Sequence, residues 1–113
     1  MNPEVKQLWV TAIRDNVSTQ IHGPLRARQK DGTYHYCVIG QLISTYCKIR
    51  GKEWKEVVDH DGMIPEDLYN WAGFEGGKQP FVKINDITAY PSIHNDHWKV
   101  PFPQIADAIQ EQL

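Results

Sequence analysis

The stretch Asp31–Ile49, DGTYHYCVIGQLISTYCKI, decides the fold of this chain. It opens with an Asp-Gly turn, continues through an aromatic run and ends in a segment with apolar residues on nearly every face. A helix that is apolar all round is expected at the centre of a core. The sequence therefore predicts a buried central helix over residues 37–50, with Cys37 at its beginning and Gly51 as its terminator.

Asp31-Gly32 predicts a short β-hairpin before this helix, because glycine accepts the positive φ of a tight turn. Its strands are expected at residues 25–29 and 33–36. Gly40 lies inside the predicted helix, where glycine costs about 1 kcal/mol relative to alanine. Its expected purpose is to let another backbone approach closely.

The rest of the chain predicts further helices around this centre. Residues 3–15 carry an apolar stripe of Val5, Leu8, Trp9, Ala12 and Ile13. Other expected elements are a polar linker at 17–24, helices at 65–71 and 103–113, and a strand at 81–84. Residues 88–101 are expected to be irregular, because Pro91 and Pro101 would interrupt a strand ladder. The prediction is an α+β, helix-rich single domain over residues 1–113.

Composition narrows the function classes. The chain has 113 residues and a formal net charge of -2, so it lacks the basic excess typical of nucleic-acid-binding domains. Cys37 and Cys47 would lie about 15 Å apart on one helix, too far for a disulfide, which favours a reducing cytoplasmic setting. No apolar run approaches the roughly 18 residues of a membrane span.

Several short motifs follow one another in a recognisable order. They are Leu25-Arg26, YCVIGQL at 36–42, IPEDLYNWAGF at 64–74, IND at 84–86 and FPQIADAI at 102–109. This order resembles a family of small uncharacterised bacterial and bacteriophage proteins. Val38 replaces a cysteine of the family pattern, residues 87–101 are longer than usual, and His94, His97 and Trp98 are outside the pattern. The resemblance implies a shared fold core and a bacterial or phage origin, and no established activity.

One enzyme hypothesis is a papain-like thiol hydrolase. Such enzymes place a nucleophilic cysteine at the start of a buried helix, where the helix dipole and a histidine lower the thiol pKa. Cys37 has that position, and His94 or His60 is the candidate base. Asn85, Asn95 and Asp96 are the candidates for orienting the base. The alternative is an inert, buried thiol.

A metal site is a second hypothesis. His94-Asn95-Asp96-His97 is an H-x-x-H pair, and Asp59-His60-Asp61 contains further ligand types for zinc. The spacing matches no recognised zinc motif, and a polar surface loop is the favoured interpretation of both segments. We therefore predict no metal and no other cofactor.

A third hypothesis is a pocket for a small anionic ligand. The start of a helix offers free N–H groups, and Arg26 and Arg28 could bind phosphate oxygens. The aromatic residues that could stack on a base are Tyr34, Tyr36, Trp71 and Trp98. A phage protein with such a pocket could sequester a nucleotide signal of host defence. The alternative is that the rings belong to the core and the arginines are solvated.

A fourth hypothesis is a protein-binding module. The segment containing Tyr90, Pro91, Ile93, His94, His97 and Trp98 is rich in residues that anchor interfaces. It could bind a host protein, mediate homo-oligomerisation or simply cover the core. We favour a non-enzymatic binding protein that captures a host protein or a small anionic ligand, with the cysteine hydrolase as the alternative.

Overall fold

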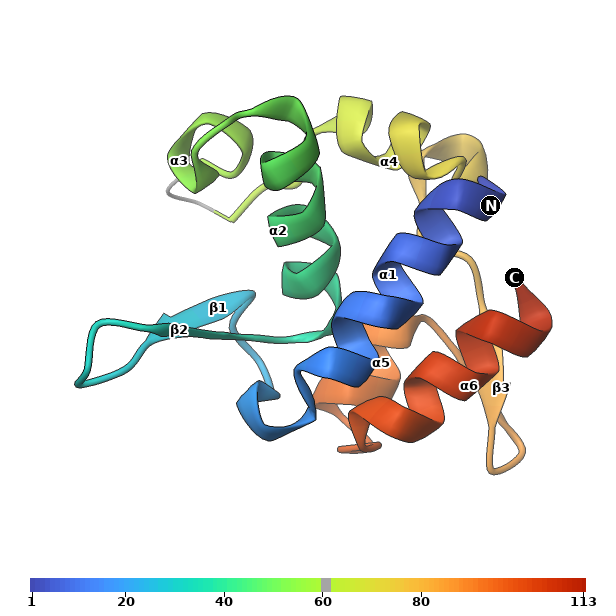
Figure 1. Ribbon diagram of the computed structural model, residues 1–113. Coiled ribbons are helices and arrows are strands. Elements are labelled where there is room, and N and C mark those ends of the chain that lie inside the picture. The colour runs from blue at the N-terminus through green and yellow to red at the C-terminus, as the bar shows by residue number, and fades with distance from the viewer. Residues whose placement is uncertain (60–61) are drawn as a thin grey trace.

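The computed structural model describes residues 1–59 and 62–113. Its helices are α1 (Pro3–Asp15), α2 (Val38–Arg50), α3 (Trp54–Val57), α4 (Glu66–Ala72), α5 (Pro91–Asp96) and α6 (Phe102–Gln112). Two antiparallel hairpins, β1 (Arg26–Arg28) with β2 (Tyr34–Tyr36) and β3 (Val82–Ile84) with β4 (Ile87–Ala89), complete the regular structure. In Figure 1 the first hairpin projects to one side, while α1 packs against α2 and α6. This architecture confirms the predicted α+β class.

Helix α2 begins and ends where the sequence predicts. Cys37 is its N-cap, and the Cys37 Sγ accepts a hydrogen bond from the Gly40 N–H at 3.3 Å. Gly51 closes it in the left-handed conformation, with φ of 63°. The first turns are buried, but the last turn at Lys48–Arg50 is exposed. The prediction of a solvent-excluded helix therefore holds for most of its length and fails at the carboxyl end, which extends past the core.

Helix α1 is capped by Asn2, whose side-chain oxygen accepts from the Glu4 N–H at 2.9 Å. Trp9 is fully buried and its indole donates to the Val38 carbonyl at 2.8 Å, which ties α1 to α2. The predicted stripe is wrong at Leu8, which is 43% exposed, while Val10 is buried instead. The reason is that α6 packs along the Val10 side of α1, which moves the buried face round the helix.

The first hairpin is shorter than predicted, and its register is regular. Arg26 lies opposite Tyr36, Ala27 opposite His35 and Arg28 opposite Tyr34. The Asp31 carboxylate accepts hydrogen bonds from the Thr33 N–H and hydroxyl, which stabilise the turn and lower the pKa of Asp31. Gly32 has φ of 88°, as the Asp-Gly signal requires. The predicted polar linker before the hairpin contains one 3₁₀ turn, Val17–Thr19.

The prediction that residues 88–101 are irregular is wrong. The segment contains part of β4 and the whole of α5. Asn85 and Asp86 have φ of 52° and 64° and form the tight turn between β3 and β4. Pro91 is the first residue of α5, where the missing N–H is harmless. Both prolines begin helices, because Pro101 is the N-cap of α6.

A polar network holds α5 against the segment before the first hairpin. The Gln20 amide donates to the side-chain oxygen of Asn95 at 2.9 Å, and Asn95 donates to the Ile21 carbonyl at 2.8 Å. The Asp96 carboxylate accepts from the Gly23 N–H at 2.9 Å. Since Asn95 is fully buried, these contacts satisfy groups that would otherwise be costly to bury.

The predicted absence of a disulfide is confirmed, since Cys37 and Cys47 are both free and buried. Within residues 1–59 and 62–113, we find no helix with the length and apolar character needed to cross a membrane.

Candidate functional site

The first hairpin gathers four of the predicted ligand-binding residues on one face. Side chains at i and i+2 of a strand share a face, and so do directly opposite residues of paired strands. Arg26 and Arg28 on β1 therefore share a face with Tyr36 and Tyr34, which lie opposite them on β2. We call this surface, together with Trp54 of α3, the hairpin face.

Trp54 is the member of the hairpin face that the sequence did not reveal. Its ring lies 4.4 Å from the Arg26 guanidinium carbon and 5.7 Å from the Tyr36 ring centre. The Arg26 guanidinium also lies 4.0 Å from the centre of the Tyr34 ring. These are cation–π and aromatic contacts, which fix the position of the Arg26 side chain. No local motif links Trp54 to the hairpin, because the contact arises only when α3 folds back after Gly51.

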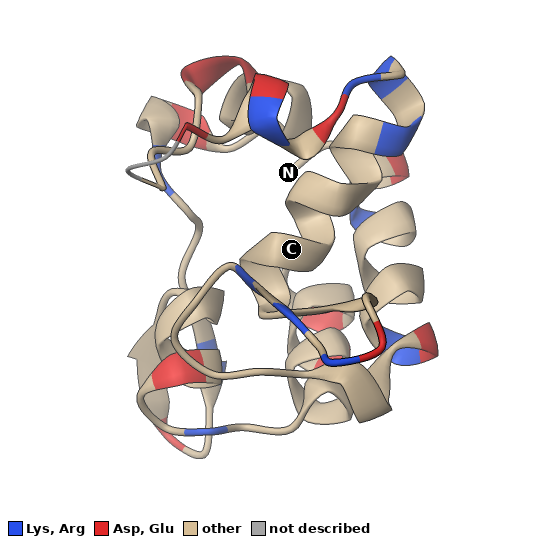
Figure 2. Ribbon diagram, turned by 90° about the vertical axis from the view of Figure 1, so that its left-hand side faces the viewer, with Lys and Arg blue, Asp and Glu red and all other residues tan. Residues whose placement is uncertain are grey.

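A groove of about 440 Å³ runs beside the hairpin face. It is lined by Pro24, Leu25, Arg26, Trp54, Val58, Asp59 and Gly62. Arg26 is half-buried and Arg28 is exposed. Among the residues that the structure describes, neither arginine has a carboxylate within ion-pair distance. The hairpin faces the viewer in Figure 2, with basic residues along β1 and at the turn.

Trp71 and Trp98 lie outside the hairpin face. Trp71 packs edge-on against Tyr46 at 5.1 Å between ring centres, in a cleft of about 690 Å³ that also contains Arg50 and Lys52. Trp98 follows α5, is 49% exposed and makes an edge contact with His97. The six predicted ligand-binding residues thus occupy three separate places, and only the hairpin face brings several of them together.

Cys37 is in an environment that suppresses thiol chemistry. Its side chain is 1% exposed. Burial raises the pKa of the Cys37 thiol from its ordinary value of 9.0 to about 11, and the Asp96 carboxylate adds to the effect. The Gly40 N–H opposes this shift without reversing it. Because the thiolate is the nucleophile, this arrangement is the reverse of an activated cysteine.

His94 is equally withdrawn from solvent. It is fully buried, and its Nε2 donates to the Val82 carbonyl at 2.9 Å. Its Nδ1 has no hydrogen-bond partner among residues 1–59 and 62–113. The other candidate base, His60, lies outside the described residues.

The residues predicted to orient a catalytic base instead make contacts that stabilise the fold. Asn95 and Asp96 belong to the polar network of α5. Asn85 lies in the turn of the second hairpin, where its φ of 52° serves the β3–β4 connection. These placements give the hydrolase hypothesis no support.

The residues of the metal hypothesis are also dispersed. His94 is buried and bonded to Val82, whereas His97 is exposed and packs on Trp98. His60 and Asp61 lie outside the described residues. In the part of the chain that the structure describes, no three His, Cys, Asp or Glu side chains come together as metal ligands would.

Comparison with known proteins gives a family and no activity. Neither the curated proteins nor the solved structures contain a match to this chain. One family model, described as a domain of unknown function (DUF8296), matches residues 1–113. The chain therefore belongs to the DUF8296 family.

Proposed function

We propose that this protein is a small non-enzymatic accessory protein that captures an anionic, nucleotide-like ligand on the hairpin face. The observation that carries the proposal is the position of Arg26. Its guanidinium stacks on Tyr34 and Trp54, so its orientation is fixed before any ligand arrives. Preorganised groups bind more tightly, because less side-chain entropy is lost on binding.

The chemistry of the hairpin face suits a phosphate attached to a base. The flat faces of a guanidinium contact rings, while its N–H groups point outward along the edge and can donate to phosphate oxygens in a fork. Arg28, two residues along the same strand, supplies a second cation within reach. Tyr34 and Tyr36 are half-exposed and offer ring surface on which a base can stack.

The buried thiol of Cys37, whose pKa is raised to about 11, favours capture over thiol-based turnover. In this proposal the protein acts in the cytoplasm of a bacterium, or of a bacterium infected by the phage that encodes it. It lowers the free concentration of a nucleotide signal of host defence. The resemblance to small bacterial and phage proteins supports this setting, and the buried Cys37 argues against the alternative of a cysteine hydrolase.

Thermal denaturation with a ligand panel tests the proposal. The panel contains inorganic phosphate, the common nucleoside mono- and diphosphates, and cyclic mono- and dinucleotides. A ligand at 100 times its dissociation constant stabilises the folded state by about 2.7 kcal/mol. We expect a base-bearing member to raise the Tm by several degrees and phosphate alone to act more weakly, because phosphate cannot stack.

Matched variants locate the binding. Arg26→Ala should weaken binding about 30-fold in calorimetry, because it removes a charged donor and one side of the stacked arrangement. Lys83→Ala is the control, since Lys83 is an exposed cation on the other hairpin and pairs only with the exposed Asp86 in the part described here. Absence of any shift across the panel, or equal losses in both variants, would contradict the proposal.

A further inference from the structure

The hydrogen bonds of the first hairpin show which backbone groups of β1 are used inside it. In an antiparallel pair, residues that bond to the opposite strand alternate with residues whose N–H and C=O groups point away from it. The Cys37 N–H donates to the Leu25 carbonyl at 3.1 Å, and the Gln29 N–H donates to the Thr33 carbonyl at 2.7 Å. Every second residue over 25–29 is therefore directed toward β2.

Arg26 and Arg28 lie between those positions, so their N–H and C=O groups point to the outer edge of β1. No hydrogen bond joins these groups to any residue that the structure describes. The outer edge of β2 is covered where the Tyr36 carbonyl accepts from the Ile21 N–H at 3.1 Å. A free strand edge can pair with an extended peptide, which adds a strand to the sheet.

The surroundings leave space for such a strand. In Figure 1, β1 forms the side of the hairpin that faces α3. A groove of about 440 Å³ adjoins it, lined from the hairpin by Leu25 and Arg26, with further apolar lining from Trp54 and Val58. Beyond the groove, Arg28 is exposed on the projecting part of the hairpin. A peptide along this edge would thus enter the groove at one end and lie open at the other.

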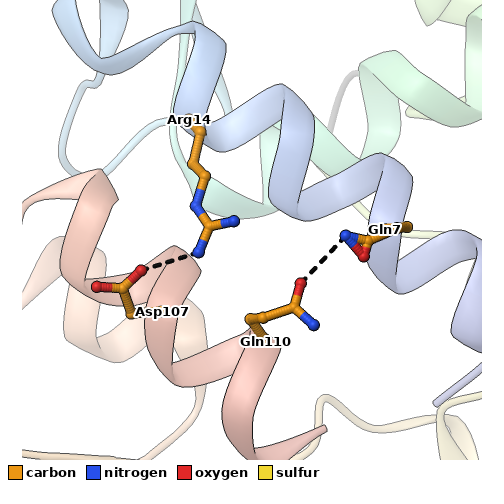
Figure 3. A network of polar contacts seen from close by, with 4 residues as sticks. All are labelled: Gln7, Arg14, Asp107 and Gln110. Atoms are coloured by element: carbon orange, nitrogen blue, oxygen red, sulfur yellow. Dashed lines mark hydrogen bonds and ion pairs between the residues drawn. The ribbon is translucent and has the colours of Figure 1, made fainter.

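The side chains along the edge are unpaired cations. Arg26 and Arg28 have no carboxylate of a described residue within ion-pair distance. By contrast, Figure 3 shows Arg14 of α1 paired with Asp107 of α6 at 2.9 Å. An added strand would place residues directly opposite both arginines of β1, with β-carbons about 5 Å apart, where opposite charges stabilise the pairing. Acidic residues therefore suit these two positions of a peptide.

The acidic residues near the edge are Asp31, Glu53, Glu56 and Asp59. Each is engaged in its own segment: Asp59, which lines the groove, accepts from the Met63 N–H at 3.1 Å. The Glu56 carboxylate accepts from the Glu53 N–H at 2.8 Å, and Glu53 pairs with Lys55 at 3.3 Å. Because Asp59 is a like charge within the groove, the acidic residues of a peptide belong opposite the two arginines and not deeper in the groove.

A second copy of this chain does not suit the edge. If two β1 edges pair antiparallel about a two-fold axis at Ala27, Arg26 of each copy lies opposite Arg28 of the other. An axis at either arginine places that residue opposite its own copy. Like charges directly opposite each other destabilise a strand pair, so the edge opposes self-pairing and favours an acidic strand.

We propose that the outer edge of β1 binds an extended acidic peptide segment of a partner protein as an added β-strand. The peptide backbone bonds to the N–H and C=O groups of Arg26 and Arg28, and acidic side chains at alternate positions lie opposite the two guanidinium side chains. The residue between them points to the other side of the sheet, beside the small side chain of Ala27. Nucleotide capture uses none of these backbone groups, so either proposal can fail alone.

Fluorescence anisotropy with a labelled synthetic peptide, measured without nucleotide, tests the proposal. The probe is a blocked peptide of about seven residues in which glutamate alternates with valine, so that the glutamates share one face and the valines favour a strand. We expect saturable binding to the full chain with a dissociation constant below about 1 mM. The same peptide with lysine in place of glutamate should bind at least about tenfold more weakly.

Methylation of the peptide backbone separates an added strand from attraction by charge alone. The amides of the glutamates opposite the arginines should bond to β1, so N-methylation there should weaken binding at least about tenfold while the charge is kept. N-methylation at the valines is the matched control, because those amides point away from β1 and should matter less.

Two variants at one position test the same point from the protein side. Arg28→Ala removes a cation and should weaken binding of the glutamate peptide about fivefold. Arg28→Pro also removes the outward N–H and should weaken binding further, and proline is tolerated there because that N–H makes no bond within the hairpin. Lys83→Ala, on the second hairpin, should leave binding unchanged.

Three results would overturn the proposal. They are no binding of the glutamate peptide, equal binding of the lysine peptide, and equal binding after methylation of the glutamate amides. If circular dichroism shows that R28P is unfolded, the methylated peptides still decide between an added strand and attraction by charge, because they leave the protein unaltered.

Discussion

The carbonyl oxygen of Leu25 occupies the space that a β-carbon on Gly40 would require. The same oxygen accepts a hydrogen bond from the Cys37 N–H at 3.1 Å. The chain entering β1 is therefore fastened to the first turn of α2, and the hairpin face takes its position from this contact.

Gly40→Ala should lower the free energy of unfolding by about 2 kcal/mol or more. The added methyl group meets backbone atoms that cannot rotate away, and this outweighs the helix propensity of alanine, which is better by about 1 kcal/mol. Urea denaturation measures the change. Ser44→Ala, one turn further along α2, is the control and should be neutral or slightly stabilising. Equal stability of G40A and the wild type would show that the Leu25 contact is not close.

Cys37 should resist alkylation until the protein unfolds. With the pKa of its thiol at about 11, the thiolate at mildly alkaline pH is about 100-fold scarcer than for a free cysteine, and the side chain is 1% exposed. Iodoacetamide labelling of a Cys47→Ser variant, read by mass spectrometry with and without urea, checks this. Rapid labelling of the native protein would revive the hydrolase hypothesis.

Burial of Cys37 should also make stability fall at alkaline pH. The folded-state pKa is about 11, above the ordinary 9.0, so between these values the unfolded state releases a proton that the folded state keeps. The free energy of unfolding should therefore decrease from about pH 9 to about pH 11, by roughly 2 kcal/mol from this group. Because burial also raises the pKa values of Cys47 and Tyr69, the comparison is with Cys37→Ala. A variant with the same alkaline slope as the wild type would exclude Cys37 as the cause.

His94→Ala should be strongly destabilising, by about 3 kcal/mol. It opens a cavity at a fully buried position and removes the donor to the Val82 carbonyl. The matched control is His97→Ala, three residues along and exposed, which should change stability by less than about 0.5 kcal/mol. Chemical denaturation compares the two variants. Similar small effects would mean that His94 is not a packing residue.

Local signals in the sequence predicted the centre of the fold. Helix α2 was predicted from its apolar segment, its start at Cys37 and its end at Gly51, and the first hairpin from Asp31-Gly32. These predictions are confirmed because caps and tight turns depend on a few neighbouring residues. Gly40 was predicted to permit a close approach, and the Leu25 carbonyl is the group that approaches.

Features set by long-range packing were harder to predict. Leu8 was expected to be buried but is exposed, and Val10 is buried in its place. The position of α6 decides which side of α1 is buried. Pro91 was interpreted as a strand breaker, although proline also begins helices, and sequence alone did not separate the two. The place of Trp54 on the hairpin face depends on how α3 turns back, which no nearby residue encodes.

Nuclear magnetic resonance of ¹⁵N-labelled protein, titrated with the nucleotide panel, tests ligand capture on the hairpin face residue by residue. We expect saturable shifts concentrated on the amides of Arg26, Arg28, Tyr34 and Tyr36 and on the indole N–H of Trp54, with the second hairpin unaffected. Ligand capture on the hairpin face would be contradicted by a spectrum that no nucleotide changes. Saturable shifts at other residues, with the resonances of these five groups unchanged, would contradict it equally.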